Sequence, residues 1–336
     1  MISMSKTKIY VTRDQPGTAL AELQNLYDVT INFEDHPVSK HVLIEQVAGV
    51  SGIIACVGDQ IDGEVMDASG GSLQAVCNAI VGFDNVDLAA ATERGIYVTN
   101  TPGVLTETVA DLTFGLMLSV ARNITSADRF IRTGTWYGWG PKQFLGIDVY
   151  GKTLGIVGLG RIGYAVAKRA QGFNMKLLFY DIYRNPKREK QYGLTYASLD
   201  TLLQQSDYVT IHVPLLPQTR HFIGKRELDL MKETAFLINS SRGPVVNEKD
   251  LIEALQTKKI RGAGLDVWDP EPPQANNPLL AMNNVVALPH IASASIETRS
   301  LMIQMAIDNL KSILQGKIPP NLVNKDVMNV RPLSSS

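Results

Sequence analysis

The chain has 336 residues, of which 45% are hydrophobic and 19% are charged, and its formal net charge at pH 7 is −1. A single hydrophobic core usually stops growing at roughly 250 to 300 residues, so this length predicts two domains, with a cleft between them as the natural place for an active site. Proteins that bind nucleic acid or anionic membranes usually carry a basic surface, which a net charge near zero does not indicate. We therefore expect neither partner and predict that the ligand is a small molecule.

Short β-rich segments alternate with helical patterns through the first third of the chain. Strand–helix alternation predicts a parallel sheet, because parallel strands need a crossover connection that is usually a helix. A helix is expected over residues 105–122, and the stretch 134–151 follows neither period, which in a compact domain usually marks a functional loop. The strands expected in this part are 9–11, 29–31, 53–55, 74–76 and 96–98.

A second series of strands follows the irregular stretch. Their continuous apolar character predicts burial on both faces of a parallel sheet. A long helix over residues 295–315 ends at Gly316 and is expected to return to the first domain. We therefore predict one domain from residues 1–100 and 292–336, and another from 101–291. The strands expected in the second series are 154–157, 176–180, 208–213, 235–238, 263–267 and 285–288.

Targeting and redox signals are absent from the sequence. The N-terminus has no apolar signal-peptide core, and the longest apolar stretch, residues 112–120, is too short to cross a bilayer. Cys56 and Cys77 show no metal-ligand or C-x-x-C spacing, so we expect buried thiols in a reducing compartment. These patterns predict a cytoplasmic protein without a metal site.

A glycine-rich hexad, GLGRIG at residues 158–163, follows an apolar strand and opens a helix. The first glycine permits a tight turn, the second lets the backbone approach a pyrophosphate, and the third lets helix and strand pack closely. Asp181 ends the next strand at about the 20-residue spacing at which an acid binds the adenine ribose of NAD. Its carboxylate would repel a 2′-phosphate, which favours NAD, while Arg184, Lys187 and Arg188 keep NADP open.

Hydride transfer to a ketone needs a proton donor and a cation for the substrate carboxylate. Of the five histidines, His36 and His41 flank a surface-looking helix start, His212 lies in a predicted strand, and His221 in a polar turn. Only His290 is predicted just past a strand end, where ligands collect in doubly wound sheets.

A lone histidine is more often structural than catalytic, but two neighbouring strand ends change that balance. An arginine, Arg242, follows one predicted strand, and the acidic segment 266–271 follows the next. These three complementary groups at three strand ends predict an active site.

Five motifs occur along the chain in one order: VGFDNVD, GKTLGIVGLGRIG, NSSRGPVVNE, GAGLDVWDPEPP and LPHIAS. Through them the sequence resembles the D-isomer-specific 2-hydroxyacid dehydrogenase family over essentially its whole length. The resemblance implies an α/β fold of two doubly wound parallel-sheet domains with a cleft between them. Residues 101–291 would form the NAD-binding Rossmann domain, and the remainder a flavodoxin-like substrate domain completed by the C-terminal helix.

The resemblance also implies roles for single residues. Arg242 would grip the substrate carboxylate and keto oxygen, His290 would donate the proton, and Glu271 would favour the charged imidazolium. The loop with Ile80, Val81 and Gly82 would offer backbone N–H groups to the carboxylate, although a simple strand exit explains it too. The residues assigned to the cofactor are Gly158, Gly160, Arg161, Ile162, Gly163, Asp181, Val213, Pro214, Thr108 and Asp266; Val213, Pro214 and Asp266 also fit capping or turn positions.

Within the family, the segment 141–151 and the loop at Asn78 look most like glyoxylate or hydroxypyruvate reductases. Phosphoglycerate dehydrogenases typically carry an arginine at the place of Asn78, and formate dehydrogenases an amide at Glu271. Phosphite dehydrogenases carry a lysine near Ile80 or Val81. We therefore predict NAD(P)H-dependent reduction of a small 2-keto acid to the D-2-hydroxy acid.

Two further expectations rest on the same resemblance. In the reductases a W-x-x-W belongs to a dimerisation arm, here residues 134–151, so Trp139 is expected to reach a partner's substrate pocket in a homodimer; tryptophans are also ordinary core residues. C-terminal-binding-protein corepressors share the fold and the Arg, Glu and His set but act as NAD-responsive binding modules. The chain lacks a long disordered tail or basic region for that role.

Overall fold

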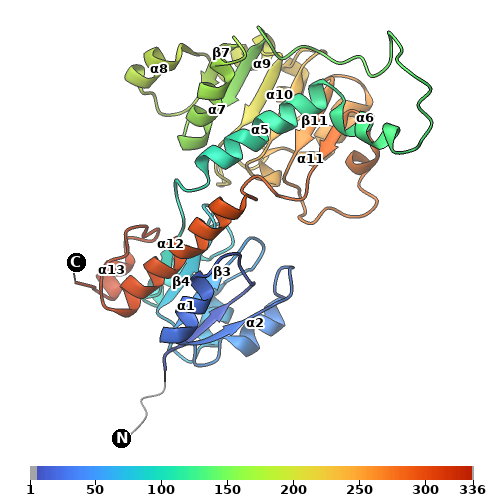
Figure 1. The fold of residues 1–336 in the computed structure, drawn as a ribbon. Helices are drawn as coiled ribbons and strands as arrows, with labels where there is room; N and C mark the ends of the chain where they lie inside the picture. The colour runs from blue at the N-terminus through green and yellow to red at the C-terminus, as the bar shows by residue number, and fades with distance from the viewer. Residues whose placement is uncertain (1–5, 335–336) are drawn as a thin grey trace, which may run out of the picture. The chain divides into compact units, whose positions relative to one another are not determined.

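The computed structural model describes residues 6–334 and divides the chain into two compact units. The first unit comprises Met1–Leu105 and Ala294–Ser336, and the second comprises Thr106–Ser293. The boundaries expected from the sequence, near residues 100 and 292, differ from these by a few residues. Each unit is an α/β structure built on its own parallel sheet, as the fold-class prediction required (Figure 1).

The first unit contains a five-stranded parallel sheet in the order β2-β1-β3-β4-β5. The long helix α12 packs on β3, β4, β5 and α1, so the last part of the chain completes the unit formed by the first part (Figure 1). The strands are β1 (Lys8–Val11), β2 (Asp28–Ile31), β3 (Gly52–Ala55), β4 (Ala75–Asn78) and β5 (Tyr97–Thr99). The helices are α1 (Ala19–Leu26), α2 (Lys40–Gln46), α3 (Gly63–Asp67), α4 (Leu88–Glu93), α12 (Ile296–Leu314) and α13 (Val327–Val330).

Both faces of this first sheet are covered by buried apolar side chains. Successive side chains of a strand point to opposite faces. Ile9 of β1 accordingly packs in one cluster with Ile303 and Leu310 of α12, whereas its neighbour Tyr10 packs in the other cluster with Leu43 of α2. Burial on both faces explains why these strands read as continuous apolar runs.

The second unit contains a seven-stranded parallel sheet in the order β12-β11-β10-β9-β6-β7-β8. Its strands are β6 (Thr153–Val157), β7 (Lys176–Tyr180), β8 (Leu194–Tyr196), β9 (Tyr208–Ile211), β10 (Phe236–Asn239), β11 (Gly262–Leu265) and β12 (Val285–Ala287). Its helices are α5 (Thr106–Ala121), α6 (Ile124–Ile131), α7 (Arg161–Gln171), α8 (Pro186–Tyr192), α9 (Leu199–Gln205), α10 (Lys225–Leu230) and α11 (Glu248–Gln256), with short 3-10 turns η1 (Gly243–Val245) and η2 (Pro278–Ala281).

The strand order of the second unit reverses at β6, which lies between β9 and β7. In open α/β sheets ligands bind outside the carboxyl ends of the strands at such a switch point. Every strand expected from the sequence is present within a few residues, but β8 was missed. Its three residues include only one buried side chain, Leu194, so the segment carries no apolar run.

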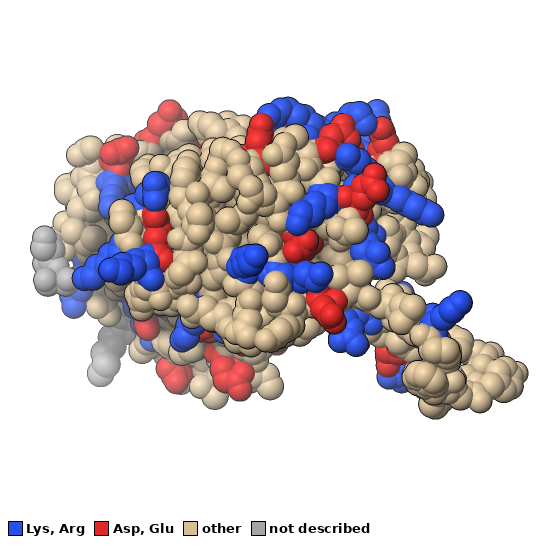
Figure 2. Space-filling model, turned by 90° about the horizontal axis from the view of Figure 1, so that it is seen from above, with Lys and Arg blue, Asp and Glu red and all other residues tan. Residues whose placement is uncertain are grey.

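The irregular stretch 134–151 contains neither helix nor strand, as its sequence predicted, and extends from the end of α6 (Figure 1). Both cysteines are buried and free, as expected, and burial raises the pKa of Cys56 to about 11 and that of Cys77 to about 12. Lys and Arg lie interspersed with Asp and Glu on the face shown in Figure 2, in keeping with the near-zero net charge. Across residues 6–334, no helix has the length and apolar character to cross a membrane.

Candidate active site

The glycine-rich loop connects β6 to α7 at the switch point of the second sheet. Gly158 has a φ of +93°, and a Cβ there would stand 2.8 Å from the backbone carbonyl of His212. A Cβ at Gly163 would overlap the carbonyl oxygen of Gly158, so helix and loop touch at this residue. At Gly160, by contrast, no atom among the described residues lies within 4 Å of a built Cβ. The loop thus leaves open space against the first N–H groups of α7, which fits a bound pyrophosphate.

The other residues expected at the cofactor surround this loop. Asp181 follows β7, and its Oδ2 accepts a hydrogen bond from the Leu159 amide at 2.6 Å. Val213, which precedes Pro214, follows β9, and its Cγ1 would be 2.8 Å from a Cβ at Gly158. Thr108 lies half-buried in the first turn of α5, a helix that packs on α7. The acid and the hydrophobic turn therefore meet the glycine-rich loop directly.

His290 and Glu271 are brought together from the loops that follow β12 and β11. The imidazole Nδ1 lies 2.5 Å from Glu271 Oε1, and the two side chains are 23% and 29% exposed. His290 has a φ of +54°, a left-handed backbone conformation that is uncommon for residues other than glycine and clusters at functional sites. With Nδ1 held by the carboxylate, Nε2 is the nitrogen that remains to exchange a proton with a substrate.

Asp266 holds the backbone that carries His290. Its carboxylate is fully buried, and its two oxygens accept the amides of Ile291 and Ala292 at 2.8 and 2.7 Å. Burial raises the pKa of this carboxyl group. The role that the structure gives Asp266 is therefore to position the loop after β12, and its role toward the cofactor stays a prediction.

Arg242 lies in the loop that follows β10, and Asn239, the last residue of that strand, bonds the backbone of this loop. Asn239 Nδ2 donates to the carbonyl of Arg242 at 2.9 Å, and Asn239 Oδ1 accepts from the amide of Ser241 at 3.1 Å. A Cβ at the next residue, Gly243, would overlap the backbone carbonyl of Trp268. The loop that carries Arg242 therefore packs directly on the loop that carries Glu271.

Trp268 connects all three of these loops, a role that the sequence did not reveal. Its backbone amide donates to Glu271 Oε2 at 3.2 Å, and its indole Nε1 donates to the carbonyl of Leu288 at 2.9 Å. Its carbonyl faces Gly243. The residue is buried, 4% exposed, and its contacts pack the three loops against one another.

In the first unit, the loop after β4 turns its carbonyl groups toward hydrogen-bond donors. The Ile80 carbonyl accepts from the Thr101 amide at 3.0 Å, and the Val81 carbonyl accepts from Asn100 Nδ2 at 2.7 Å. Asn78 Nδ2 donates to the Gly82 carbonyl at 3.2 Å. Within residues 6–334, the backbone N–H groups of residues 80–82 donate to no protein acceptor. These amides are therefore available to donate to an anion, and their binding of a substrate carboxylate stays a prediction.

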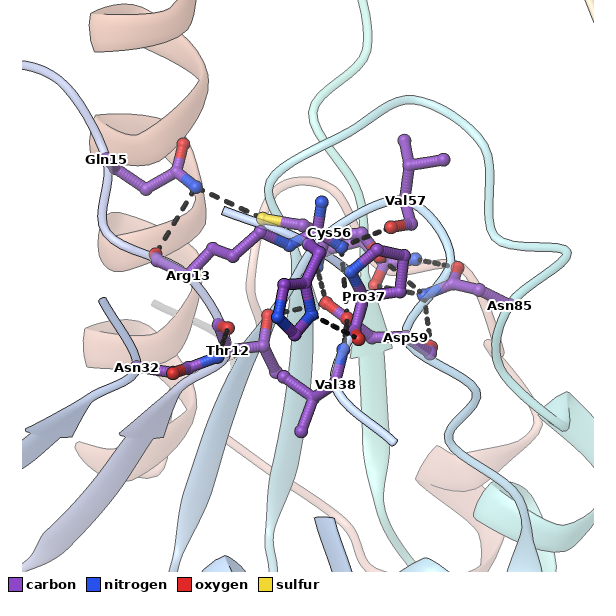
Figure 3. A network of polar contacts seen from close by, with 12 residues as sticks. Thr12, Arg13, Gln15, Asn32, Pro37, Val38, Cys56, Val57, Asp59 and Asn85 are labelled. Atoms are coloured by element: carbon purple, nitrogen blue, oxygen red, sulfur yellow. Dashed lines mark hydrogen bonds and ion pairs between the residues drawn. The ribbon is translucent and has the colours of Figure 1, made fainter. Parts of the chain in front are cut away.

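A buried polar network around Asp59 and Asn85 is connected to this loop through Asn78; its part between Thr12 and Asn85 is shown in Figure 3. Asn78 Nδ2 donates to Asn85 Oδ1 at 2.8 Å, and Asn85 Nδ2 donates to the carbonyls of Cys56 and Asp59 at 3.3 and 3.1 Å. The fully buried Asp59 carboxylate in turn accepts from the Thr12 hydroxyl at 2.6 Å. It also accepts from the Arg13 guanidinium and from the amides of Val38 and Cys56. Asn85 lies inside the VGFDNVD motif, but its structural role was missed.

The prediction that His212 lies within a strand is wrong. Strand β9 ends at Ile211, so His290 is not the only histidine just past a strand end. Burial lowers the pKa of His212 to about 3, and its Nε2 is 2.9 Å from the Thr210 hydroxyl. His212 is therefore neutral near pH 7 and bound to its own strand, which leaves His290 as the proton donor that this geometry favours.

The sequence model of a protein family, the D-isomer specific 2-hydroxyacid dehydrogenase NAD-binding domain, matches residues 114–292 of the chain. The chain is also 49% identical to the glyoxylate reductase of Korarchaeum cryptofilum, over 97% of this chain and 98% of that one. This chain belongs to the D-isomer specific 2-hydroxyacid dehydrogenase family. The glyoxylate reductase of Thermococcus litoralis is 46% identical, over 97% of the dehydrogenase and 99% of the relative.

Solved structures agree with this assignment. A protein from Thermus thermophilus superposes with a TM-score of 0.89 at 43% identity, covering 94% of the dehydrogenase and 100% of that chain. The NADPH-dependent glyoxylate/hydroxypyruvate reductase of Sinorhizobium meliloti, solved with NADP and malonate, superposes with a TM-score of 0.83 at 33% identity, covering 99% of both chains. The family resemblance expected from the motifs is confirmed, and the dehydrogenase is an NAD(P)-dependent oxidoreductase of 2-keto and 2-hydroxy acids.

Replacing Trp268 with phenylalanine is expected to slow the dehydrogenase while leaving cofactor binding intact. The variant keeps an aromatic ring but loses the indole N–H, which leaves the Leu288 carbonyl unpaired. If the His290 loop moved by about 1 Å as a result, kcat would fall by up to about 10²-fold. Tyr208→Phe is the matched control, because it removes a bond of the same length, 2.9 Å, from the Tyr208 hydroxyl to the Asp148 carbonyl. Equal kcat values in the two variants would count against a positioning role.

Replacing Asn85 with alanine is expected to weaken binding of the 2-keto acid selectively. The change releases the Asn78 amide that holds the Gly82 carbonyl, so KM should rise roughly tenfold, with kcat and the Kd of NADH little changed. Asn324→Ala is the control: Asn324 is also buried and bonds the Ile96 carbonyl in the same unit at 2.9 Å. Both variants should lose about 1–3 kcal/mol of stability. Only Asn85→Ala should change KM.

Proposed function

We propose that this dehydrogenase reduces glyoxylate, and hydroxypyruvate as a second substrate, to the D-2-hydroxy acid with NADH. The observation that carries the proposal is the Glu271–His290 pair, 2.5 Å apart beside the carboxyl ends of β11 and β12. A carboxylate-held imidazole at this edge of a dinucleotide-binding sheet is suited to exchange a proton with a keto oxygen. High identity to two enzymes named glyoxylate reductase supports the choice of acid.

In the proposed mechanism the chain binds and polarises the keto acid. The planar guanidinium of Arg242 binds the carboxylate and the keto oxygen, and the N–H groups of residues 80–82 bind carboxylate oxygen. When bound, the nicotinamide supplies the hydride that reduces C2. His290 gives its Nε2 proton to the oxygen as the C=O bond becomes C–OH, and the Glu271 carboxylate stabilises the imidazolium before that transfer.

The loop after β4 also supports a small acid over a phosphorylated one. Asn78 is uncharged and buried, and its amide is already engaged with Asn85 and Gly82. Residues 78–82 contain no cationic side chain. A substrate phosphate buried there would lack the charge partner that it needs, which argues against 3-phosphohydroxypyruvate.

A homodimer in the cytoplasm is the proposed working form. The arm 134–151 exposes three adjacent aromatic side chains, with Trp136 49%, Tyr137 99% and Trp139 84% accessible. Helix α6, which leads into the arm, buries no residue in the monomer. Large apolar side chains left together in water are typical of surfaces that bind a partner. Two buried, unreactive thiols suit a reducing compartment.

Truncating Trp139 is the test of the arm. Trp139→Ala is expected to raise KM for glyoxylate several-fold or to change the preference between glyoxylate and hydroxypyruvate, since the ring would contribute to a partner's pocket. Phe33→Ala is the control, because Phe33 is also exposed, 74%, but lies outside the arm. The mass of both variants in solution should be measured alongside. An unchanged KM and preference would remove Trp139 from the substrate site.

The proposed function is tested by initial rates of NADH and NADPH oxidation with glyoxylate, hydroxypyruvate, pyruvate and 3-phosphohydroxypyruvate. We expect high rates with NADH and the first two acids. Preference for the phosphorylated acid would overturn the substrate assignment. Absence of turnover with all four would favour a cofactor-sensing binding role over catalysis of this reaction.

A further inference from the structure

The segment after β7 determines how the dehydrogenase meets the adenosine end of its cofactor. Asp181 stands at the position where an acid binds the ribose diol, and NADP differs from NAD there by a 2′-phosphate. Such a phosphate needs a cation, and the sequence offers three: Arg184, Lys187 and Arg188. The cofactor preference therefore depends on whether these side chains are available.

Arg184 is engaged by an acidic side chain five residues further along the chain. Its Nε and Nη2 donate to Oε1 and Oε2 of Glu189 at 3.2 and 2.6 Å, the two-pronged arrangement that suits a guanidinium and a carboxylate. Its Cζ also lies 4.6 Å from the ring centre of Tyr196. The guanidinium thus has both an ionic and an aromatic partner within the protein.

Glu189 is itself held in place. Its side chain is 9% exposed, whereas that of Arg184 is 52% exposed. Its amide donates to the Asn185 carbonyl at 2.9 Å in the first turn of α8, whose N-cap is Asn185. The Arg184 guanidinium lowers the pKa of the Glu189 carboxyl group, so the pair stays ionised near neutral pH. The carboxylate is therefore the fixed member of the pair.

Arg188 also has a partner within the protein, and the Asp181 side chain is bonded to the glycine-rich loop. The Arg188 Cζ lies 4.7 Å from the ring centre of Tyr164 on α7. The Asp181 carboxylate is oriented by the amides of Leu159 and Tyr183, at 2.6 and 2.9 Å. A 2′-phosphate would meet this carboxylate and two arginines that already have partners; Lys187, the third cation, is exposed in the first turn of α8.

We propose that Glu189 is a specificity-determining residue: by holding Arg184 it withholds that cation from a 2′-phosphate and makes the dehydrogenase selective for NAD. Binding NADP through Arg184 would require breaking a two-pronged ion pair and exposing a nearly buried carboxylate. The inference rests on the proposed function only in that it concerns the same cofactor site. It explains how a segment rich in cations can still belong to an NAD enzyme.

The test is the affinity of the purified protein for NADH, NADPH, 5′-ADP and 2′,5′-ADP, measured by calorimetry without any keto acid. Wild-type protein should bind NADH and 5′-ADP more tightly than their 2′-phosphorylated counterparts. Glu189→Gln should tighten binding of NADPH and 2′,5′-ADP by roughly tenfold and leave NADH unchanged. Glu253→Gln is the control, since it releases Lys225 from an exposed pair of 2.6 Å elsewhere in the unit.

A second variant keeps the proposal testable if loss of Glu189 impairs folding. Arg184→Met should leave the NADPH affinity of the otherwise unchanged protein as it is, because Arg184 is already withheld. In the Glu189→Gln background the same change should abolish the gain. Weaker NADPH binding in Arg184→Met alone, or no gain in Glu189→Gln, would overturn the proposal. Since none of these binding measurements requires turnover, they would still test the role of Glu189 if the protein did not reduce glyoxylate.

Discussion

Replacing His290 with alanine is expected to lower kcat for glyoxylate reduction by about 10²- to 10⁴-fold, the contribution typical of a positioned general acid. The imidazole is the group that Glu271 orients at 2.5 Å, and His212 cannot replace it because burial lowers the His212 pKa to about 3. The Kd of NADH should change little, since the glycine-rich loop is untouched. Single-turnover rates with saturating NADH would separate the chemical step from binding.

His221→Ala is the matched control for this experiment. His221 lies in the same unit, also has a left-handed backbone with a φ of +53°, and also stands near a carboxylate, 3.7 Å from Asp269. Its removal should leave kcat within a few-fold of the original value. Near-normal turnover in His290→Ala, or an equal loss in both variants, would contradict the assignment of His290 as proton donor.

Replacing Arg242 with lysine is expected to lower kcat/KM by about 10²- to 10³-fold, although the charge is kept. A lysine ammonium is a point charge and cannot copy the fork with which guanidinium binds a carboxylate and a keto oxygen together. The loss should appear in both kcat and KM, because the keto oxygen gains negative charge during reduction. The Kd of NADH should again stay unchanged.

Arg220→Lys provides the comparison for Arg242→Lys. Arg220 is 54% exposed and lies 3.7 Å from Asp269, so its exchange tests the effect of an arginine change in the same unit. We expect normal kinetics for this variant. If added guanidinium partly restores activity to Arg242→Ala but not to the protein lacking His290, the fork geometry is the missing element. Full activity in Arg242→Lys would refute it.

The fold was predictable where strands are buried on both faces. Continuous apolar runs such as Leu154–Val157 mark such strands, and the glycine-rich hexad marked the loop that follows β6, the strand at which the order of the second sheet reverses. Strand β8 was not predicted because its three residues, with one buried side chain, are too few to show the alternation of apolar and polar residues that marks a strand. The end of β9 was misjudged because His212 and Val213 continue an apolar-looking run, while hydrogen bonding stops at Ile211.

The sequence was sufficient to propose the reacting groups, and the structure pairs two of them, Glu271 and His290, but the residues that hold them were not predictable. Arg242, Glu271 and His290 stand at strand ends and belong to motifs, so type and position both point to chemistry. Trp268 and Asn85 bond backbone carbonyls, and Glu189, which we propose to set cofactor preference, bonds a neighbouring arginine. Their partners are chosen by how loops pack, as when Gly243 meets Trp268, and no spacing in the chain encodes that contact.

The hydrogen bonds that shape the loop 78–82 come from Asn78, Asn100 and Thr101, all within the first unit. The bonds through which Trp268 and Asp266 fix the Glu271–His290 pair lie within the second. The loop that we propose to bind the substrate carboxylate and the pair that we propose to transfer the proton are thus shaped by separate stretches of chain, while Arg242, the other proposed carboxylate ligand, belongs to the second unit. A library confined to positions 78–85 would therefore vary the proposed substrate loop without changing any residue whose hydrogen bonds hold the Glu271–His290 pair.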